Sequence, residues 1–171
     1  MLVDAFNYKL WADKRTLEAA ALVDAAAYPT EHSFIRQQFN HMAIVEENFK
    51  ARLLGIIEPH SQSNTETVPD LKTLIGRLNE SRDWYRQYVA ILKPEQLTEI
   101  TRFTFVDGKR GRLSRQEILF HVINHGTYHR GAIGHALDIA GNLRPADTYT
   151  LYIHATEPER RFEPQSTATM C

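Results

Sequence analysis

The sequence predicts an all-α fold: a four-helix bundle with one long crossover connection and a small hairpin before the last long helix. Four segments of about 20 residues repeat apolar side chains at the helical period, and one short stretch alternates as a strand does. We expect a single domain over residues 1–155 and a flexible tail over residues 156–171, which are polar and contain two prolines. The periodicity leaves the helix order open.

The first two helices are predicted in the first third of the chain. Apolar residues recur at about one helical turn from Leu2 to Ala21, and no proline interrupts them. The second helix is predicted between an N-cap at Ser33 and a stop at Gly55. Its apolar series contains one carboxylate, Glu46. Because buried carboxylates are rarely unpaired, we expect Glu46 to meet a cation, a histidine or the shell around a metal.

A long polar connection, residues 59–69, precedes the third predicted helix. Asp70 can cap this helix, and Pro94 ends it. Residues 103–107 then alternate in polarity and end in an Asp-Gly pair at Gly108, which is typical of a hairpin.

The fourth helix is predicted from an N-cap at Ser114 to Gly141. The run 149–153 that follows it is apolar enough to pack back on the bundle.

Charge and cysteine content narrow the class of protein. Lysine and arginine number 20 and aspartate and glutamate 21, so the net charge of -1 gives no overall field for DNA or an anionic membrane. Basic residues gather around the hairpin, but a solvated loop is the favoured interpretation and a nucleic-acid partner is not expected. The only cysteine, Cys171, excludes an internal disulfide. Without an apparent signal peptide or membrane span, we expect a cytoplasmic protein.

Three of the eight histidines, His121, His125 and His129, fall within nine residues of the fourth helix. Residues four apart share a helix face, about 6 Å apart along the axis. His125 and His129 interrupt the apolar stripe, and unpaired polar groups in a core cost about 1–3 kcal/mol each. One metal ion satisfies both rings. His41, beside Met42 on the apolar face of the second helix, is the candidate third ligand.

Three neutral imidazoles suit one divalent transition metal, namely Zn²⁺, Ni²⁺, Fe²⁺ or Cu²⁺, and leave positions open for water or substrate. The alternative is that His125 and His129 are core residues that bind no metal. His121 lies beside the stripe and is expected outside the ligand set. The run from His125 to His129 lacks the glutamate of H-E-x-x-H, and no E-x-x-H pair exists for a di-iron site. The other histidines are expected to be ordinary surface or structural residues: His32, His60, His135 and His154.

The fourth helix resembles that of the DinB family, whose hallmark N-H-G-T-Y-H-R-G stands here at residues 124–131. The pair Asn40-His41 is similar to the N-H of that family's second helix, and residues 103–108 resemble its hairpin. Near the start, Asn7-Tyr8 and Trp11-Ala12 are similar to its Y-N-x-W-A-N signature, with the Tyr-Asn order altered and Asp13 where asparagine is usual. The match runs from about residue 4 to residue 155.

This resemblance implies a four-helix bundle with a crossed-over helix order and a three-histidine metal site, which transfers onto His41, His125 and His129. Relatives in the wider superfamily include thiol-dependent S-transferases and a mycothiol-dependent isomerase, and many members have no known activity. Nothing in the sequence supports the unrelated DNA polymerase of the same name. Membership of the family predicts the fold and the site, but it does not predict the reaction.

Two functions remain open. The first is a metal-dependent thiol S-transferase of stress response or detoxification, acting on a low-molecular-weight thiol or another small molecule. The second is a non-catalytic, metal-binding or stress-linked module. An apolar pocket with an open metal position favours the enzyme, and a fourth protein ligand favours the module. A homodimer is also expected, because Trp84, Tyr85 and Tyr88 cannot all face one core.

Overall fold

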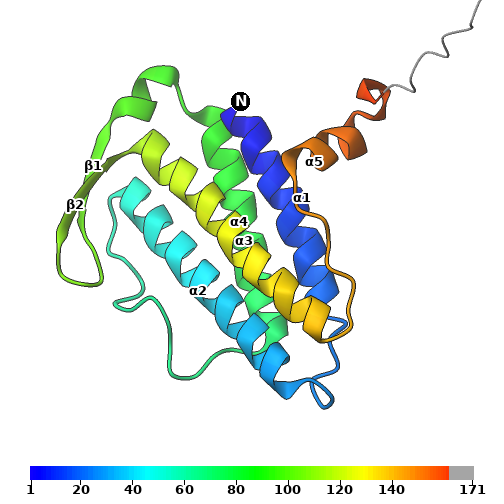
Figure 1. The fold of residues 1–171 in the computed structure, drawn as a ribbon. Helices are drawn as coiled ribbons and strands as arrows, with labels where there is room; N and C mark the ends of the chain where they lie inside the picture. The colour runs from blue at the N-terminus through cyan, green and yellow to red at the C-terminus, as the bar shows by residue number, and fades with distance from the viewer. Residues whose placement is uncertain (162–171) are drawn as a thin grey trace, which may run out of the picture.

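The computed structural model describes residues 1–161, which form a mostly helical fold with a small two-stranded sheet (Figure 1). The four long helices lie side by side, with α1 and α2 each packed against both α3 and α4. No helix among these residues is long and apolar enough to cross a membrane. The elements are α1 (Leu2–Ala20), α2 (Pro29–Leu54), α3 (Leu71–Ile91), β1 (Ile100–Thr104), β2 (Arg110–Ser114), α4 (Arg115–Ile139) and α5 (Tyr149–Thr156), with short 3₁₀ turns at Pro94–Thr98 and Pro158–Arg160.

Local residue types explain most of the helix ends. Asp70 and Ser114 cap α3 and α4, each accepting a hydrogen bond from the backbone N–H three residues further on. Gly55 ends α2 with a left-handed φ of 67°, a conformation that glycine adopts without steric cost. The predicted start of α2 at Ser33 is wrong. The helix begins at Pro29, whose fixed φ and missing N–H suit the first helical position.

The hairpin lies where the sequence predicted it. Strands β1 and β2 pair in antiparallel register, with Arg102 opposite Arg112, and Gly108 in the turn has a φ of 82°. Phe103 and Leu113 pack from the hairpin against the end of the core. The hairpin therefore covers one end of the helices rather than standing free (Figure 1).

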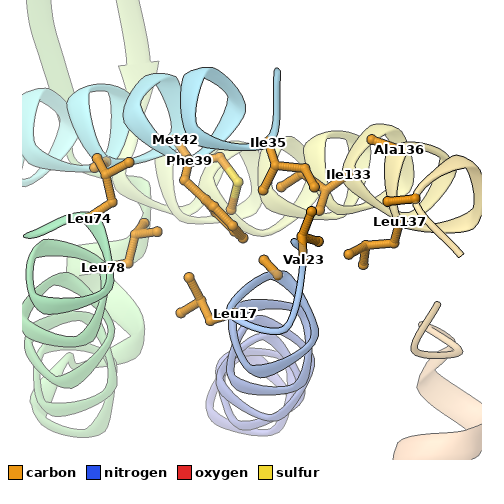
Figure 2. Close-up of a cluster of buried hydrophobic side chains, with 13 residues drawn as sticks. Leu17, Val23, Ile35, Phe39, Met42, Leu74, Leu78, Ile133, Ala136 and Leu137 are labelled. Carbon is orange, nitrogen blue, oxygen red and sulfur yellow. The ribbon is translucent and has the colours of Figure 1, made fainter. Parts of the chain in front are cut away.

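Buried apolar side chains form two clusters along the helices, and buried polar residues separate them. On α1, Lys9 lies in sequence between Phe6 of one cluster and Leu17 of the other. On α2, Glu46 and its neighbours divide the clusters in the same way. Figure 2 shows the cluster remote from the hairpin, which includes Leu17, Ile35, Phe39, Met42, Leu74, Leu78, Ile133 and Leu137.

The segment after α4 packs back on the helices, as predicted. Tyr8 of α1 meets the rings of Tyr149 and Tyr152 of α5 at centroid distances of 5.6 and 6.0 Å. Part of the expected tail is ordered into the 3₁₀ turn at Pro158–Arg160. The rest of that prediction concerns residues 162–171, which lie outside the described residues.

The aromatic residues of α3 are mostly covered within the chain. Tyr85 is buried and stacks on Phe6 at 5.5 Å, while Trp84 and Tyr88 are half-buried and stack on each other at 4.7 Å. The observation that favoured a homodimer is thereby weakened, and the dimer stays a prediction.

Candidate metal site

Three imidazoles converge between α2 and α4. His41 projects from α2, and His125 and His129 project from adjacent turns of α4. The Nε2 atom of His125 lies 3.0 Å from that of His41 and 3.0 Å from that of His129. One nitrogen of each ring lies within 4.8 Å of the others. The structure thus brings together the three residues that the sequence singled out.

The outward-facing nitrogens of two rings are held by neighbouring groups. His41 Nδ1 donates to the carbonyl oxygen of Ser63 at 2.7 Å, and His129 Nδ1 donates to Oε1 of Gln38 at 2.6 Å. A proton on Nδ1 leaves the lone pair on Nε2, the atom that faces the other rings. Ser63 belongs to the long connection between α2 and α3, so this connection helps to orient a candidate ligand.

The arrangement of lone pairs fits a metal ion. His41 and His129 donate their Nδ1 protons outward, so each presents an Nε2 lone pair to His125. A proton on Nε2 of His125 can be donated to only one of these two nitrogens at a time. At the other Nε2···Nε2 contact, two atoms that both lack a proton to share then lie at hydrogen-bond distance. A cation bound by all three Nε2 atoms removes that conflict, so the three residues could hold a metal ion.

The rings of His125 and His129 are neutral near pH 7, as metal binding requires. Burial, together with the nearby rings of His129 and His41, lowers the pKa of His125 to about 3. Burial, with His41 close by, lowers the pKa of His129 to about 4. Protons therefore do not compete for these nitrogens at neutral pH.

A cavity of about 330 Å³ opens beside His41 and His125. His121 also lines it, with its ring centroid 5.3 Å from that of His125. His121 does not belong to the group of three converging imidazoles. The site is therefore bordered by a space that a small molecule can enter.

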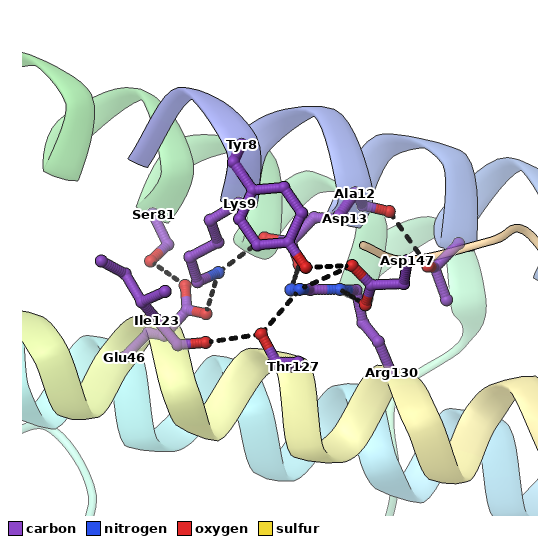
Figure 3. Close-up of polar contacts among 11 residues, drawn as sticks. Tyr8, Lys9, Ala12, Asp13, Glu46, Ser81, Ile123, Thr127, Arg130 and Asp147 are labelled. Carbon is purple, nitrogen blue, oxygen red and sulfur yellow. Dashed lines mark hydrogen bonds and ion pairs between the residues drawn. The ribbon is translucent and has the colours of Figure 1, made fainter. Parts of the chain in front are cut away.

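Glu46 lies in a buried charged network rather than among the imidazoles (Figure 3). Lys9 Nζ is 2.6 Å from Asp13 and 2.7 Å from Glu46, so the expectation that Glu46 meets a cation is confirmed. Arg130 of α4 pairs with Asp13 at 2.7 Å and with Asp147 at 2.8 Å. The network links α1, α2 and α4 to the segment before α5.

The two carboxyls that share Lys9 have pKa values shifted in opposite directions. Burial raises the pKa of Asp13, but the charges of Lys9 and Arg130 outweigh burial and bring the pKa below its usual value. At Glu46, burial outweighs the single neighbouring cation, and the pKa is raised. Sequence reasoning missed Lys9, Asp13 and Arg130 as a group. The available signal was a Lys–Asp pair at i,i+4 near the middle of the first predicted helix.

Three imidazoles that converge from two helices of a helical fold are typical of a metal-binding protein. Comparison with known proteins places the chain within one family. The family model described as the DinB family matches residues 1–162, and the chain belongs to this family. It is 25% identical over 171 residues to Protein DinB of Bacillus subtilis (strain 168), a match that covers 91% of this chain and 95% of that protein. No solved structure matches the chain significantly.

Proposed function

We propose that the chain binds one divalent transition metal through His41, His125 and His129, held in the four-helix bundle that α1 to α4 would form. The convergence of the three Nε2 atoms carries this proposal. Within residues 1–161, no further His, Cys, Asp or Glu joins the group. Three protein ligands leave positions for water or substrate, as in catalytic sites. Zinc, nickel and iron all accept such a donor set.

We further propose that the protein is a thiol S-transferase of stress response or detoxification. A divalent metal lowers the pKa of a coordinated thiol and supplies a thiolate at neutral pH. Three neutral imidazoles suit that role, because they leave the charge of the ion uncancelled. In the transfer, the sulfur electron pair forms a bond to an electrophilic carbon, the leaving group departs with its own pair, and the thiol proton passes to water.

The experiment begins with elemental analysis of protein purified without a metal-affinity tag. We expect one equivalent of a transition metal in the wild type and steep losses in His41→Ala, His125→Ala and His129→Ala. The matched control is His135→Ala, which changes an exposed ring of the same helix. A full complement of metal in the three variants would overturn the site.

The second step measures thiol transfer to a simple electrophile with several biological thiols. Chelation is expected to abolish the rate above background, and added metal is expected to restore it in the wild type and in His135→Ala. Full metal binding with equal rates in all samples would leave a non-catalytic metal-binding module as the function.

A further inference from the structure

We propose that the cavity beside His41 and His125 binds an uncharged, largely apolar small molecule with one polar or reactive end. This inference rests on the proposed function, since such a molecule would be the electrophile that accepts the thiol. Its binding can nevertheless be measured without metal or thiol.

The walls of the cavity are mostly apolar. They come from α2, the connection that follows it, the hairpin and α4. The volume of about 330 Å³ is at the lower end of the range of roughly 300–1,000 Å³ that is usual for small-molecule pockets. A compact molecule therefore fits better than a peptide. The apolar lining consists of Ile44, Val45, Phe49, Phe105, Val106 and Leu113.

Arg52, the permanently charged residue of the cavity lining, is paired with the carboxylate of Glu58. Arg52 donates two hydrogen bonds of 2.8 Å to the carboxylate of Glu58. Its guanidinium also lies 4.1 Å from the ring centroid of Phe103 and 4.6 Å from that of Phe49. An anionic ligand would compete with Glu58 for the charge of this guanidinium. The wall therefore favours a neutral ligand over an anionic one.

The free hydrogen-bonding capacity lies at the imidazole end of the cavity. The side-chain amide of Asn48 is occupied, since it donates to the carbonyl of His60 at 2.9 Å and accepts from its N–H at 3.1 Å. His121 has no hydrogen-bond partner within residues 1–161. The centroid of its ring lies 4.9 Å from that of Phe49 and 5.3 Å from that of His125. A ligand would direct its polar end toward His121 and the metal site, with its apolar part against the hairpin.

Two fluorescent probes that share one aromatic skeleton test this inference on the chelated, metal-free protein. Uncharged phenylnaphthylamine is expected to bind saturably with a rise in emission. Anilinonaphthalene sulfonate, which adds one negative charge, is expected to bind at least about tenfold more weakly, because its charge meets no free cation. Equal affinities, or tighter binding of the sulfonate, would overturn the inference.

Paired variants locate the bound probe. Val106→Asp places a carboxylate at the mouth of the cavity and is expected to weaken phenylnaphthylamine binding about tenfold. Ile139→Asp is the control, because Ile139 is similarly exposed, 53% against 57% for Val106, and does not line the cavity. Val45→Phe fills the cavity from α2 and is expected to weaken binding as well. Affinities unaffected by Val106→Asp and Val45→Phe would contradict the assignment.

A cobalt-loaded sample separates this inference from the proposed function. Paramagnetic Co²⁺ at the three imidazoles is expected to broaden the proton signals of bound phenylnaphthylamine, and Zn²⁺ is not. If the probe binds as expected but no thiol transfer occurs, the cavity assignment stands and the transferase proposal fails. If metal binds but the probe does not, the cavity assignment fails and the metal site stands.

Discussion

Gln38 and His129 form a hydrogen bond between α2 and α4, with His129 Nδ1 donating to Gln38 Oε1 at 2.6 Å. This bond directs the lone pair of His129 toward the other two rings. Gln38→Leu is expected to lower metal affinity about tenfold to a hundredfold, because groups that orient a ligand tune its binding. Competition with a chromophoric chelator measures the effect. The exposed neighbour provides the control, Gln37→Leu, and equal affinities in the two variants would contradict this role.

Lys9 compensates two buried carboxylates, so its removal is expected to be costly. Lys9→Met leaves Glu46 without a cation and is expected to destabilise the fold by about 3–5 kcal/mol in urea unfolding. Asp13 keeps its ion pair with Arg130, so adding Glu46→Gln removes the carboxylate that has lost its cation, and the double variant is expected to be more stable than Lys9→Met. Lys14→Met, at an exposed lysine of the same helix, is expected to change stability by less than about 0.5 kcal/mol. A double variant less stable than Lys9→Met would contradict the pairing.

The two glycines of the α4 motif are expected to respond oppositely to alanine. A Cβ at Gly126 would lie 3.0 Å from Arg130 Nη1 and 3.1 Å from Lys9 Cε, two side chains held by buried ion pairs. At Gly131 it would meet nothing within 4 Å. Gly131→Ala is therefore expected to stabilise the protein by up to about 1 kcal/mol, and Gly126→Ala to destabilise it. Thermal unfolding of both variants checks this, and a stabilised Gly126→Ala would refute the tight fit.

The cap of α4 predicts a pH-dependent stability. The backbone N–H and the hydroxyl of Ser114 donate to Glu117, and these bonds lower the pKa of that carboxyl. A lowered folded-state pKa means that the stabilisation is present above the unfolded-state pKa, and it is lost as the pH falls through the folded-state value. The loss of stability in Glu117→Ala is therefore expected near neutral pH and to shrink in acid.

Urea unfolding of metal-free protein over a pH series measures this effect. Ser114→Ala is expected to cost about 1 kcal/mol near neutral pH. Gln116→Ala, at an exposed neighbour, is the control. A difference between Glu117→Ala and the wild type that does not change with pH would rule out the ionised cap.

Local signals predicted the elements well, because caps and turns depend on neighbouring residues. Asp70, Ser114 and Gly55 end or begin helices where their chemistry indicated. The start of α2 differs from the prediction because Ser33 is a good N-cap residue by type, whereas the helix begins four residues earlier at Pro29, which suits the first helical position. Two start signals four residues apart compete, and the sequence alone does not decide between them.

The candidate ligands could be found because they interrupt an apolar stripe, whereas their surroundings could not. Ser63 and Gln38 reach the imidazoles only once α2, α4 and the long connection are packed together. The pairing of Lys9 with Glu46 depends in the same way on the rotation of two helices about their axes. Such contacts between distant parts of the chain leave no periodic trace in one sequence.

The histidines and part of the apolar lining of the cavity belong to different elements, which affects how the ligand preference of the protein can change during evolution. The imidazoles stand on two long helices with a buried core, whereas Phe105, Val106 and Leu113 belong to a short hairpin at one end. Replacements in the hairpin can reshape the cavity without disturbing α2, α4 or the histidines, since loops tolerate change better than the elements they join. Successive descendants could thus acquire different ligand preferences around one inherited trio of imidazoles.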